Sequence, residues 1–282
     1  MRPDQEVIAR WTGSAPYWEK HHQVIRQLFA PVTEALVQDA QISTQHQVLD
    51  LATGPGEPAL SLVPLVGPRG KVFGVDAIPE MVAAARRTAD RLDLKNAQFE
   101  VAFADQLPFP ADAFDAVISR FGVMFFPAPI DALREILRVL KPGKKLAVAV
   151  WHLVEQNPFF YSMSRVIDQH FEPTPLPSDA PDAFRFSTPG KLLELFREAG
   201  VEAPSERLLQ FKINTSTELE DFWSLRIEMS EKLREKVNSL SSERLAEVRR
   251  QAIESLREYS TARGMSFPAE VLIVSGTKRR ST

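Results

Sequence analysis

Between residues 45 and 151, short apolar segments alternate with segments of helical periodicity, and this alternation limits the possible folds more than any other feature. Five apolar segments have the length and composition of buried strands: 47–52, 71–76, 97–104, 114–120 and 145–151. Helices are expected between them over 57–66, 79–92 and 129–140. A strand, a helix and a second strand in succession form a right-handed unit with parallel strands. The pattern therefore predicts an α/β fold with a doubly wound, mostly parallel sheet.

The chain divides into three parts around this pattern. Residues 1–44 have apolar side chains at helical spacing and predict an N-terminal helical cap, which Pro31 kinks or divides. Residues 45–151 form the core. We expect residues 152–282 to complete the sheet.

The last part contains two further strand-like segments, 207–213 and 269–276, with a charged helical block at about 217–260 between them. Thr217-x-x-Glu220 fits a capping box at the start of this block. Residues 158–170 and 189–200 also predict helices, and the four prolines within 171–181 predict a surface loop. The helical block is therefore an insertion, and it would cover the carboxyl ends of the strands or bind a partner.

A glycine loop follows the first strand of the core, in VLDLATGPGEPAL (48–60). Gly54 and Gly56 permit positive φ and let a ligand lie against the backbone. About twenty residues further on, the second strand ends in Asp76, which can accept hydrogen bonds from ribose hydroxyls. This arrangement predicts a site for an adenosine-containing cofactor.

The glycine loop alone leaves two cofactors open. Gly54, Gly56 and Ala59 also satisfy the G-x-G-x-x-A pattern of nicotinamide dinucleotide sites. However, Asp50, Asp76 and Asp105 would surround the site, and residues 50–60 contain no lysine or arginine. Carboxylates repel a pyrophosphate but attract the ammonium and sulfonium of S-adenosylmethionine (SAM). The charges therefore favour SAM.

Composition excludes some other classes. The formal net charge is -3, so the chain has no general attraction for nucleic acid, and the cluster Lys278, Arg279 and Arg280 is typical of a solvated tail. There are 0 cysteines, which removes thiolate chemistry, and we expect no metal site. No signal peptide and no apolar run of roughly 20 residues are evident. We therefore expect a cytoplasmic protein that does not enter the membrane, and its oligomeric state stays open.

Four segments together resemble the class I SAM-dependent methyltransferases, in the branch that includes the ubiquinone and menaquinone biosynthesis enzymes. They are VLDLATGPGEP, VFGVDAIPEMV, FADQLPFPADAFDAVISRFGVMFF and LREILRVLKPGKKLAVAVW. The resemblance covers residues 45–151 and implies a seven-stranded Rossmann-like sheet with an antiparallel last strand. It implies a methyltransferase that uses SAM and releases S-adenosylhomocysteine. Residues 120–129 depart from the quinone enzymes, which argues against a quinone ring as the acceptor.

The resemblance also implies which residues hold SAM. Those assigned to the methionyl part, the ribose, the adenine and the sulfonium are, in chain order, Asp50, Ala52, Thr53, Gly54, Gly56, Asp76, Ala77, Met81, Ala104, Asp105, Gln106, Ser119, Arg120 and Phe121.

Methyl transfer is an in-line displacement that depends mainly on positioning, so no nucleophilic triad is expected. His152, directly after the fifth strand, is the best candidate for a general base, ahead of His21 and His22. The candidate residues for a small-molecule acceptor are Trp11, Tyr17, Trp18, Trp151, Trp223 and Arg226. Two alternatives stay open: a nicotinamide-dependent oxidoreductase, and a non-catalytic SAM-binding or scaffold protein.

Overall fold

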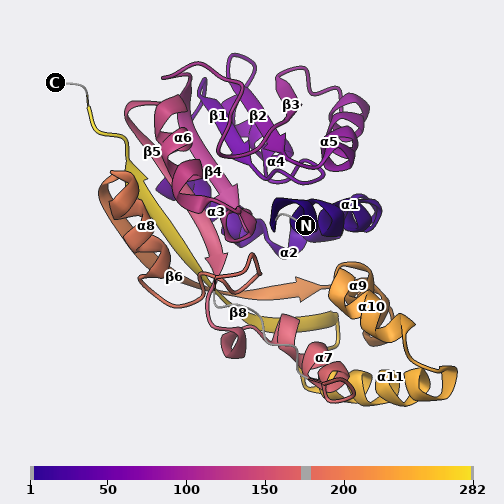
Figure 1. The fold of residues 1–282 in the computed structure, drawn as a ribbon. Coiled ribbons are helices and arrows are strands. Elements are labelled where there is room, and N and C mark those ends of the chain that lie inside the picture. The colour runs from indigo at the N-terminus through magenta and orange to yellow at the C-terminus, as the bar shows by residue number, and fades with distance from the viewer. Residues whose placement is uncertain (1–2, 173–178, 281–282) are drawn as a thin grey trace.

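A single mixed sheet runs through the protein, whose computed structural model describes residues 3–172 and 179–280 (Figure 1). Its strands are β1 Gln47–Leu51, β2 Lys71–Asp76, β3 Ala97–Val101, β4 Phe114–Arg120, β5 Leu140–Trp151, β6 Glu202–Thr215, β7 Ser260–Thr261 and β8 Gly264–Thr277. The order is β3-β2-β1-β4-β5-β8-β6, with β7 paired to β8 off this path. Strands β1 to β5 pair in parallel, and β8 is antiparallel to both β5 and β6. The predicted doubly wound sheet with an antiparallel last strand is confirmed, and the two-residue β7 is an addition.

Helices cover both faces of this sheet. They are α1 Pro3–Lys20, α2 His22–Leu28, α3 Ala30–Asp39, α4 Ala59–Val66, α5 Pro79–Arg91, α6 Pro129–Val139, α7 Pro158–Asp168, α8 Lys191–Ala199, α9 Leu219–Glu228, α10 Glu231–Asn238 and α11 Ser242–Leu256. The chain runs from β1 towards β3 in one direction and from β4 to β5 in the other. Right-handed connections therefore place α4 and α5 on the face opposite α6. Helix α6 packs against α8 on its own face.

The N-terminal cap consists of three helices instead of one helix divided at Pro31. Helix α1 already begins at Pro3 and contains Pro16 in its interior. The breaks fall at His21 and at Phe29. Pro31 lies in the first turn of α3, where its missing N–H has no partner to lose. The prediction of helices was correct, and the expected position of the break was wrong.

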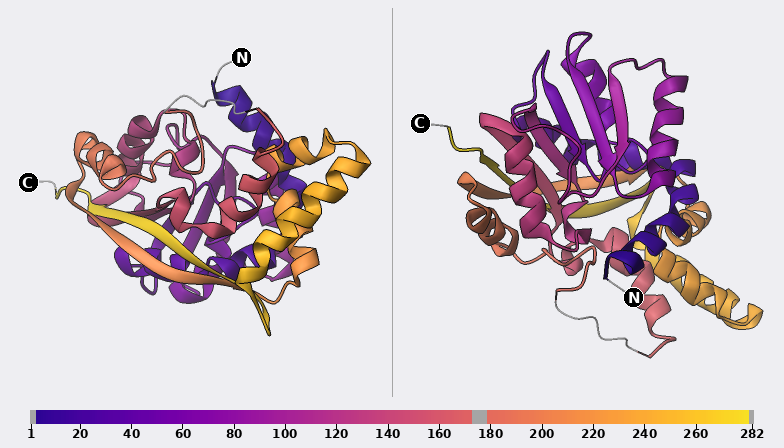
Figure 2. Two further views of the ribbon diagram at one scale, coloured as in Figure 1. Left: turned by 90° about the horizontal axis from the view of Figure 1, so that it is seen from below. Right: turned by 45° about the horizontal axis from the view of Figure 1, so that its top comes forward.

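The helical block between β6 and β8 projects beyond the far end of the sheet (Figures 1 and 2). Its α11 packs against α7, and its α10 contacts α1. The predicted capping box is wrong, because Glu218 is the N-cap of α9 and the Thr217 hydroxyl interacts with Thr215. The block is also interrupted: Ser230 caps α10 by accepting from the backbone N–H of Leu233.

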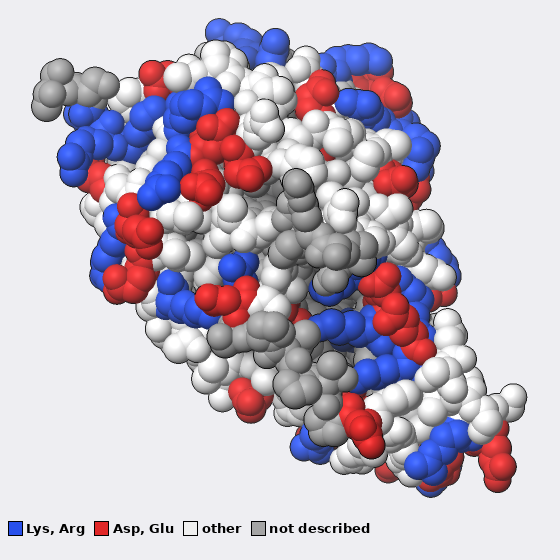
Figure 3. Space-filling view, viewed as in Figure 1, with Lys and Arg blue, Asp and Glu red and all other residues white. Residues whose placement is uncertain are grey.

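Charged side chains of both signs are interspersed on the face shown in Figure 3. Within residues 3–172 and 179–280, no helix is long and apolar enough to cross a membrane. In the same ranges, no group of three or more histidine, aspartate or glutamate side chains is arranged to hold a metal ion. The part of the predicted 171–181 loop that the structure describes contains bends and turns, and residues 173–178 of that prediction lie outside the described residues.

Candidate active site

The turn after β1 is held together by the buried carboxylate of Asp50. Its Oδ2 accepts a hydrogen bond from Thr53 Oγ1 at 2.7 Å and another from the backbone N–H of Ala59 at 3.0 Å. Asp50 is 0% exposed, and burial raises its pKa to about 7. The expectation that Asp50 faces the ligand is therefore corrected: its side chain ties the glycine loop to the first turn of α4.

Gly56 lets this loop turn tightly onto α4. Its φ is +110°, and a Cβ there would lie 2.6 Å from Cδ1 of Leu60 and 3.2 Å from Cβ of Ala85. Any larger residue would be strained in the backbone and would clash with the helix. Gly56 therefore shapes the loop on the side that packs against α4 and α5, whereas Gly54 lies at the surface where a ligand would rest.

Asp76 joins the end of β2 to the same loop. Its Oδ2 accepts from the backbone N–H of Gly54 at 2.9 Å, and its Oδ1 accepts from that of Ile78 at 3.0 Å. Burial raises the pKa of Asp76 to about 6. The residue is partly exposed and lines a cavity, as its position at the end of a parallel strand predicts.

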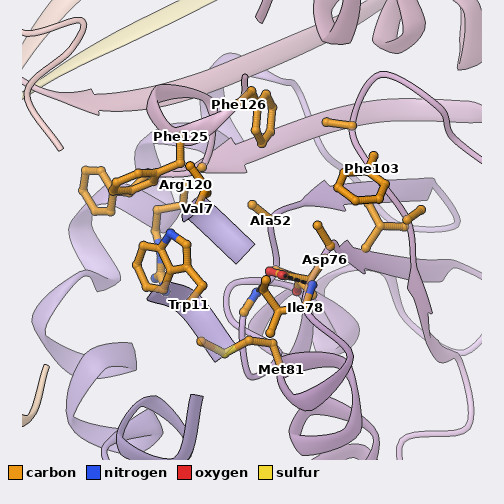
Figure 4. A pocket seen from close by; sticks show the side chains of 18 of the residues that line it. Val7, Trp11, Ala52, Asp76, Ile78, Met81, Phe103, Arg120, Phe125 and Phe126 are labelled. Atoms are coloured by element: carbon orange, nitrogen blue, oxygen red, sulfur yellow. Dashed lines mark hydrogen bonds between the residues drawn. The ribbon is translucent and has the colours of Figure 1, made fainter. Parts of the chain in front are cut away.

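This glycine-loop cavity has a volume of about 400 Å³ and lies at the carboxyl ends of β1, β2 and β4. Trp11 and Phe103 lie on opposite sides of it, with Ala52 and Asp76 between them (Figure 4). The predicted cofactor residues that line it are Ala52, Thr53, Gly54, Asp76, Ala77, Met81, Ala104, Asp105, Gln106, Arg120 and Phe121. The structure therefore brings most of the predicted set to one place.

Carboxylates outnumber cations in the wall of the glycine-loop cavity. Glu57, Asp76 and Asp105 line it, and Arg120 is its one arginine among the described residues. Arg120 is 8% exposed and donates to Thr33 Oγ1 at 2.8 Å. Burial lowers the pKa of Arg120, although the nearby acidic groups oppose this shift. The excess of negative charge suits a cationic ligand.

Two non-glycine residues at this site have positive φ. Ala52 follows β1 with φ +55°, and Phe121 follows β4 with φ +63°. Their loops touch at Gly122, where a Cβ would lie 2.5 Å from Cβ of Ala52. Such conformations cost free energy and gather at functional sites, where the surrounding packing enforces them. Close packing between these two loops thus shapes the backbone on this side of the cavity.

A second, aromatic cavity of about 190 Å³ adjoins the first. The residues common to both walls are Trp11, Trp18, Phe29, Phe121 and Phe125. Beyond this shared wall, the aromatic cavity is bounded by α7, α9 and α10.

The ring of Trp151 forms one side of the aromatic cavity. It stacks on Phe121 with ring centroids 4.2 Å apart and an interplanar angle of 6°. Phe159 and Phe160 of α7 extend the apolar wall. The cavity therefore continues from the end of β4 to the helical block.

Of the predicted acceptor residues, Trp151 and Arg226 line the aromatic cavity, and Trp11 and Trp18 line both cavities. Tyr17 and Trp223 line neither. The Tyr17 ring lies 4.4 Å from the guanidinium carbon of Arg234, and Trp223 is buried in the core at 8% exposure. Their aromatic side chains in segments expected to cover the site made both of them candidates, but this could not distinguish packing from a cavity wall.

His152 also lies outside both cavities. Its Nδ1 is 2.7 Å from Glu270 Oε2 on β8. Ser119, expected under the sulfonium, instead donates to the backbone carbonyl of Leu51 at 2.9 Å and is buried. Of the weaker candidates, His22 lines the glycine-loop cavity and His21 is paired with Glu228. The expectation that His152 faces the reacting centre is therefore corrected.

Several cavity residues were not predicted. Phe103 follows β3 and is 44% exposed, Phe125 and Phe126 follow β4, and Glu57 closes the glycine loop. The rule that residues after the carboxyl end of a parallel strand face the ligand crevice missed Phe103, because the predicted strand 97–104 contained it. No comparable rule applies to Val7 and Ile8 on α1.

A profile of the family described as "Methyltransferase domain" matches residues 42–200, more than half of the 282 residues. The chain therefore belongs to the methyltransferase domain family. Within it, the chain is a class I SAM-dependent methyltransferase with sequence similarity to the UbiE-like branch.

Two relatives illustrate the similarity. The uncharacterized methyltransferase YcgJ of Bacillus subtilis is 34% identical over 123 residues, which cover 44% of this chain and 47% of YcgJ. The ubiquinone/menaquinone biosynthesis C-methyltransferase UbiE of Pseudomonas fluorescens is 38% identical over 130 residues, which cover 46% of this chain and 49% of that UbiE. The matched part of the chain thus spans about half the length of these relatives.

The likeness extends further in three dimensions. The crystal structure of Bacillus subtilis YcgJ superimposes with a TM-score of 0.56 at 21% identity, covering 88% of this chain and 98% of that one. At this identity the comparison shows a shared fold.

Proposed function

We propose that the protein transfers the methyl group of SAM to a small-molecule acceptor. One observation carries the proposal: a carboxylate-rich cavity beside the glycine loop shares its wall with an aromatic cavity. Two ligands bound in these cavities would meet at the shared residues Trp11, Trp18 and Phe121. Group transfer between two molecules requires such a meeting point.

The residues present fit SAM. Gly54 offers an open backbone surface, since a Cβ there would meet nothing within 4 Å. Asp76 and Asp105 both line the cavity, where Asp76 could accept from the ribose hydroxyls and Asp105 from the adenine amino group that the resemblance assigns to it. The surplus of carboxylates suits the ammonium and the sulfonium. We assign SAM to the predicted residues that line the glycine-loop cavity.

When bound, SAM supplies a methyl group already activated by its sulfonium. The protein then has to align the acceptor and exclude water. The shared aromatic side chains serve both purposes, because they form an apolar wall on the side of each cavity that faces the other. No histidine of the described residues lines the aromatic cavity, so the proposal assigns no general base.

Helices α9 and α10 would cover the bound acceptor. Arg226, Met229, Ser230, Glu231 and Lys232 from this part of the insertion line the aromatic cavity. This supports the acceptor lid that the position of the insertion predicted.

Calorimetric titration with SAM, S-adenosylhomocysteine and NAD tests the cofactor assignment. We expect the two sulfur compounds to bind and NAD not to bind. Binding of NAD alone would instead support the nicotinamide-dependent oxidoreductase. Transfer of labelled methyl from SAM to small molecules of a metabolite extract tests the chemistry, and SAM binding without any transfer would favour a non-catalytic SAM-binding protein.

A further inference from the structure

One arginine in the aromatic cavity has no partner for its charge. Arg226 of α9 is 4% exposed and lines the cavity. Its guanidinium carbon lies 4.5 Å from the centroid of the Phe159 ring and 5.1 Å from that of Phe160. Its Nε is buried without a hydrogen-bond partner. Buried charges are normally paired, so this arrangement requires an explanation.

The other charged side chains of the aromatic cavity are already paired with one another. Lys232 Nζ lies 2.9 Å from Asp182 Oδ2, and Arg10 Nε lies 3.7 Å from Glu231 Oε2. These two pairs cancel in charge. Among the described residues that line this cavity, Arg226 is left as a single uncompensated positive charge.

The buried polar atoms that lack a partner in this cavity are all donors. Among the described residues of the aromatic cavity, the buried side-chain atoms without a partner are Arg226 Nε and Trp18 Nε1. Both are N–H groups, which can donate but not accept. A complementary ligand must therefore supply acceptor oxygens.

Burial lowers the pKa of Arg226 to about 10, so the guanidinium is still charged at neutral pH. A planar guanidinium matches a carboxylate in two parallel hydrogen bonds. The same fork also fits a phosphate, but a phosphate dianion would keep one uncompensated negative charge beside the single free cation of this cavity. The surrounding rings of Phe159, Phe160 and Trp151 would contact an apolar body.

We propose that the methyl acceptor is a small carboxylic acid, with its carboxylate on Arg226 and its apolar body among the aromatic rings. This proposal rests on the proposed function and names the class of its acceptor. The carboxylate then anchors the far end of the acceptor, and the end to be methylated points to the wall shared with the glycine-loop cavity.

The test compares carboxylates with their neutral amides. Protein saturated with S-adenosylhomocysteine is titrated with benzoate, 3-phenylpropanoate and hexanoate, and with the corresponding amides. We expect at least one carboxylate to bind roughly ten- to a hundredfold more tightly than its amide, as for a charged hydrogen-bonded pair. Phenyl phosphate is included, and we expect it to bind more weakly than benzoate.

Variants then assign the preference to Arg226. Arg226→Gln should abolish the difference between acid and amide, and Arg226→Lys should restore part of it. The control Arg249→Gln removes an equal charge from the same insertion, outside the cavity, where Arg249 pairs with Glu220. It should keep the wild-type preference.

Three results would overturn the proposal: no acid that binds better than its amide to the wild type, tighter binding of phenyl phosphate, or an unchanged preference in Arg226→Gln. The wild-type comparison decides even if the variant does not fold. Binding of S-adenosylhomocysteine is measured first in the same cell. If S-adenosylhomocysteine does not bind, the result counts against the proposed function. If it binds normally but no acid binds better than its amide, the result counts only against a carboxylic acid as the acceptor.

Discussion

The two cavities are built in different ways. The glycine-loop cavity is shaped by backbone, through Gly54, Gly56 and the positive φ of Ala52, within a few residues of strand ends. The aromatic cavity is shaped by side chains from segments far apart in the sequence, such as Trp11 on α1 and Arg226 on α9. The strand-end wall of the first is therefore determined by local sequence, whereas its wall on α1 and α2, like the second cavity, depends on how helices pack together.

The largest predicted effect is a loss of stability on substitution of Trp223 in α9, one of the helices that bound the aromatic cavity. Trp223→Ala should lower the free energy of unfolding by about 3–5 kcal/mol, as for other buried aromatic truncations. Because Trp223 lines neither cavity, S-adenosylhomocysteine affinity should be unchanged in the folded fraction. Denaturant unfolding and calorimetry measure the two quantities. The control Leu208→Ala, at a residue 45% exposed on β6, should change stability little. If Trp223→Ala kept its stability but used the acceptor poorly, Trp223 would contact the acceptor after all.

Gly56→Ala tests the backbone-shaped cavity. The required φ of +110° should cost about 1–3 kcal/mol, and the 2.6 Å approach to Leu60 adds to it. We expect lower stability together with weaker S-adenosylhomocysteine binding. Gly200→Ala is the matched control, because Gly200 also has positive φ but nothing near its Cβ and lies outside both cavities. Equal losses of affinity in the two variants would show that the loop has no special role.

Asp76→Asn tests the negative charge of the Asp76 side chain, because it removes the charge and keeps the size and shape of the side chain. The amide keeps one acceptor oxygen, so the contacts to Gly54 and Ile78 are only partly lost. We expect cofactor binding to weaken by about 1.5–3 kcal/mol, the range for hydrogen bonds to charged groups. Glu100→Gln removes a carboxylate from neighbouring β3 outside the cavities and should have no such effect. Unchanged affinity in Asp76→Asn would mean that the ribose binds elsewhere.

The smallest effect is a pH dependence. The pKa of Asp76 is raised to about 6, and a ribose donor favours the ionised carboxylate. Affinity for S-adenosylhomocysteine should therefore rise with pH through about 6 and be roughly tenfold lower one unit below that pKa. The stability effect has the opposite sign: between about pH 4 and 6 the folded state holds more protons, so unfolding becomes easier as pH rises. The Asp76→Asn variant should lack this part of both profiles.

The parallel part of the sheet and its glycine loop could be predicted because the sequence patterns that indicate them are local. The strand segments, the glycine turn and the position of Asp76 follow from short stretches of sequence, and β4 begins and ends where predicted, at Phe114 and Arg120. Strand β3 ends at Val101, three residues earlier than expected. The following residues turn away to bring Phe103 to the cavity.

The aromatic half was predicted only in part. Trp223 and Arg226 were candidates at the start of one helical block, but the sequence could not show that Arg226 lines a cavity and that Trp223 is packed in the core, because this depends on how α9 packs against other elements. The same limit applies to Tyr17, whose ring is covered by Arg234 of α10. Contacts between segments more than 200 residues apart are not encoded in any local pattern.

The position of the insertion has an evolutionary consequence. Strands β6 and β8 form a long antiparallel ribbon, paired from Glu202 with Thr277 to Thr215 with Met265, and α9 to α11 lie beyond its far end. Substitutions or length changes in those helices leave the ribbon's hydrogen bonds intact. Selection can therefore rebuild the surface over the aromatic cavity without changing the sheet that carries the glycine loop.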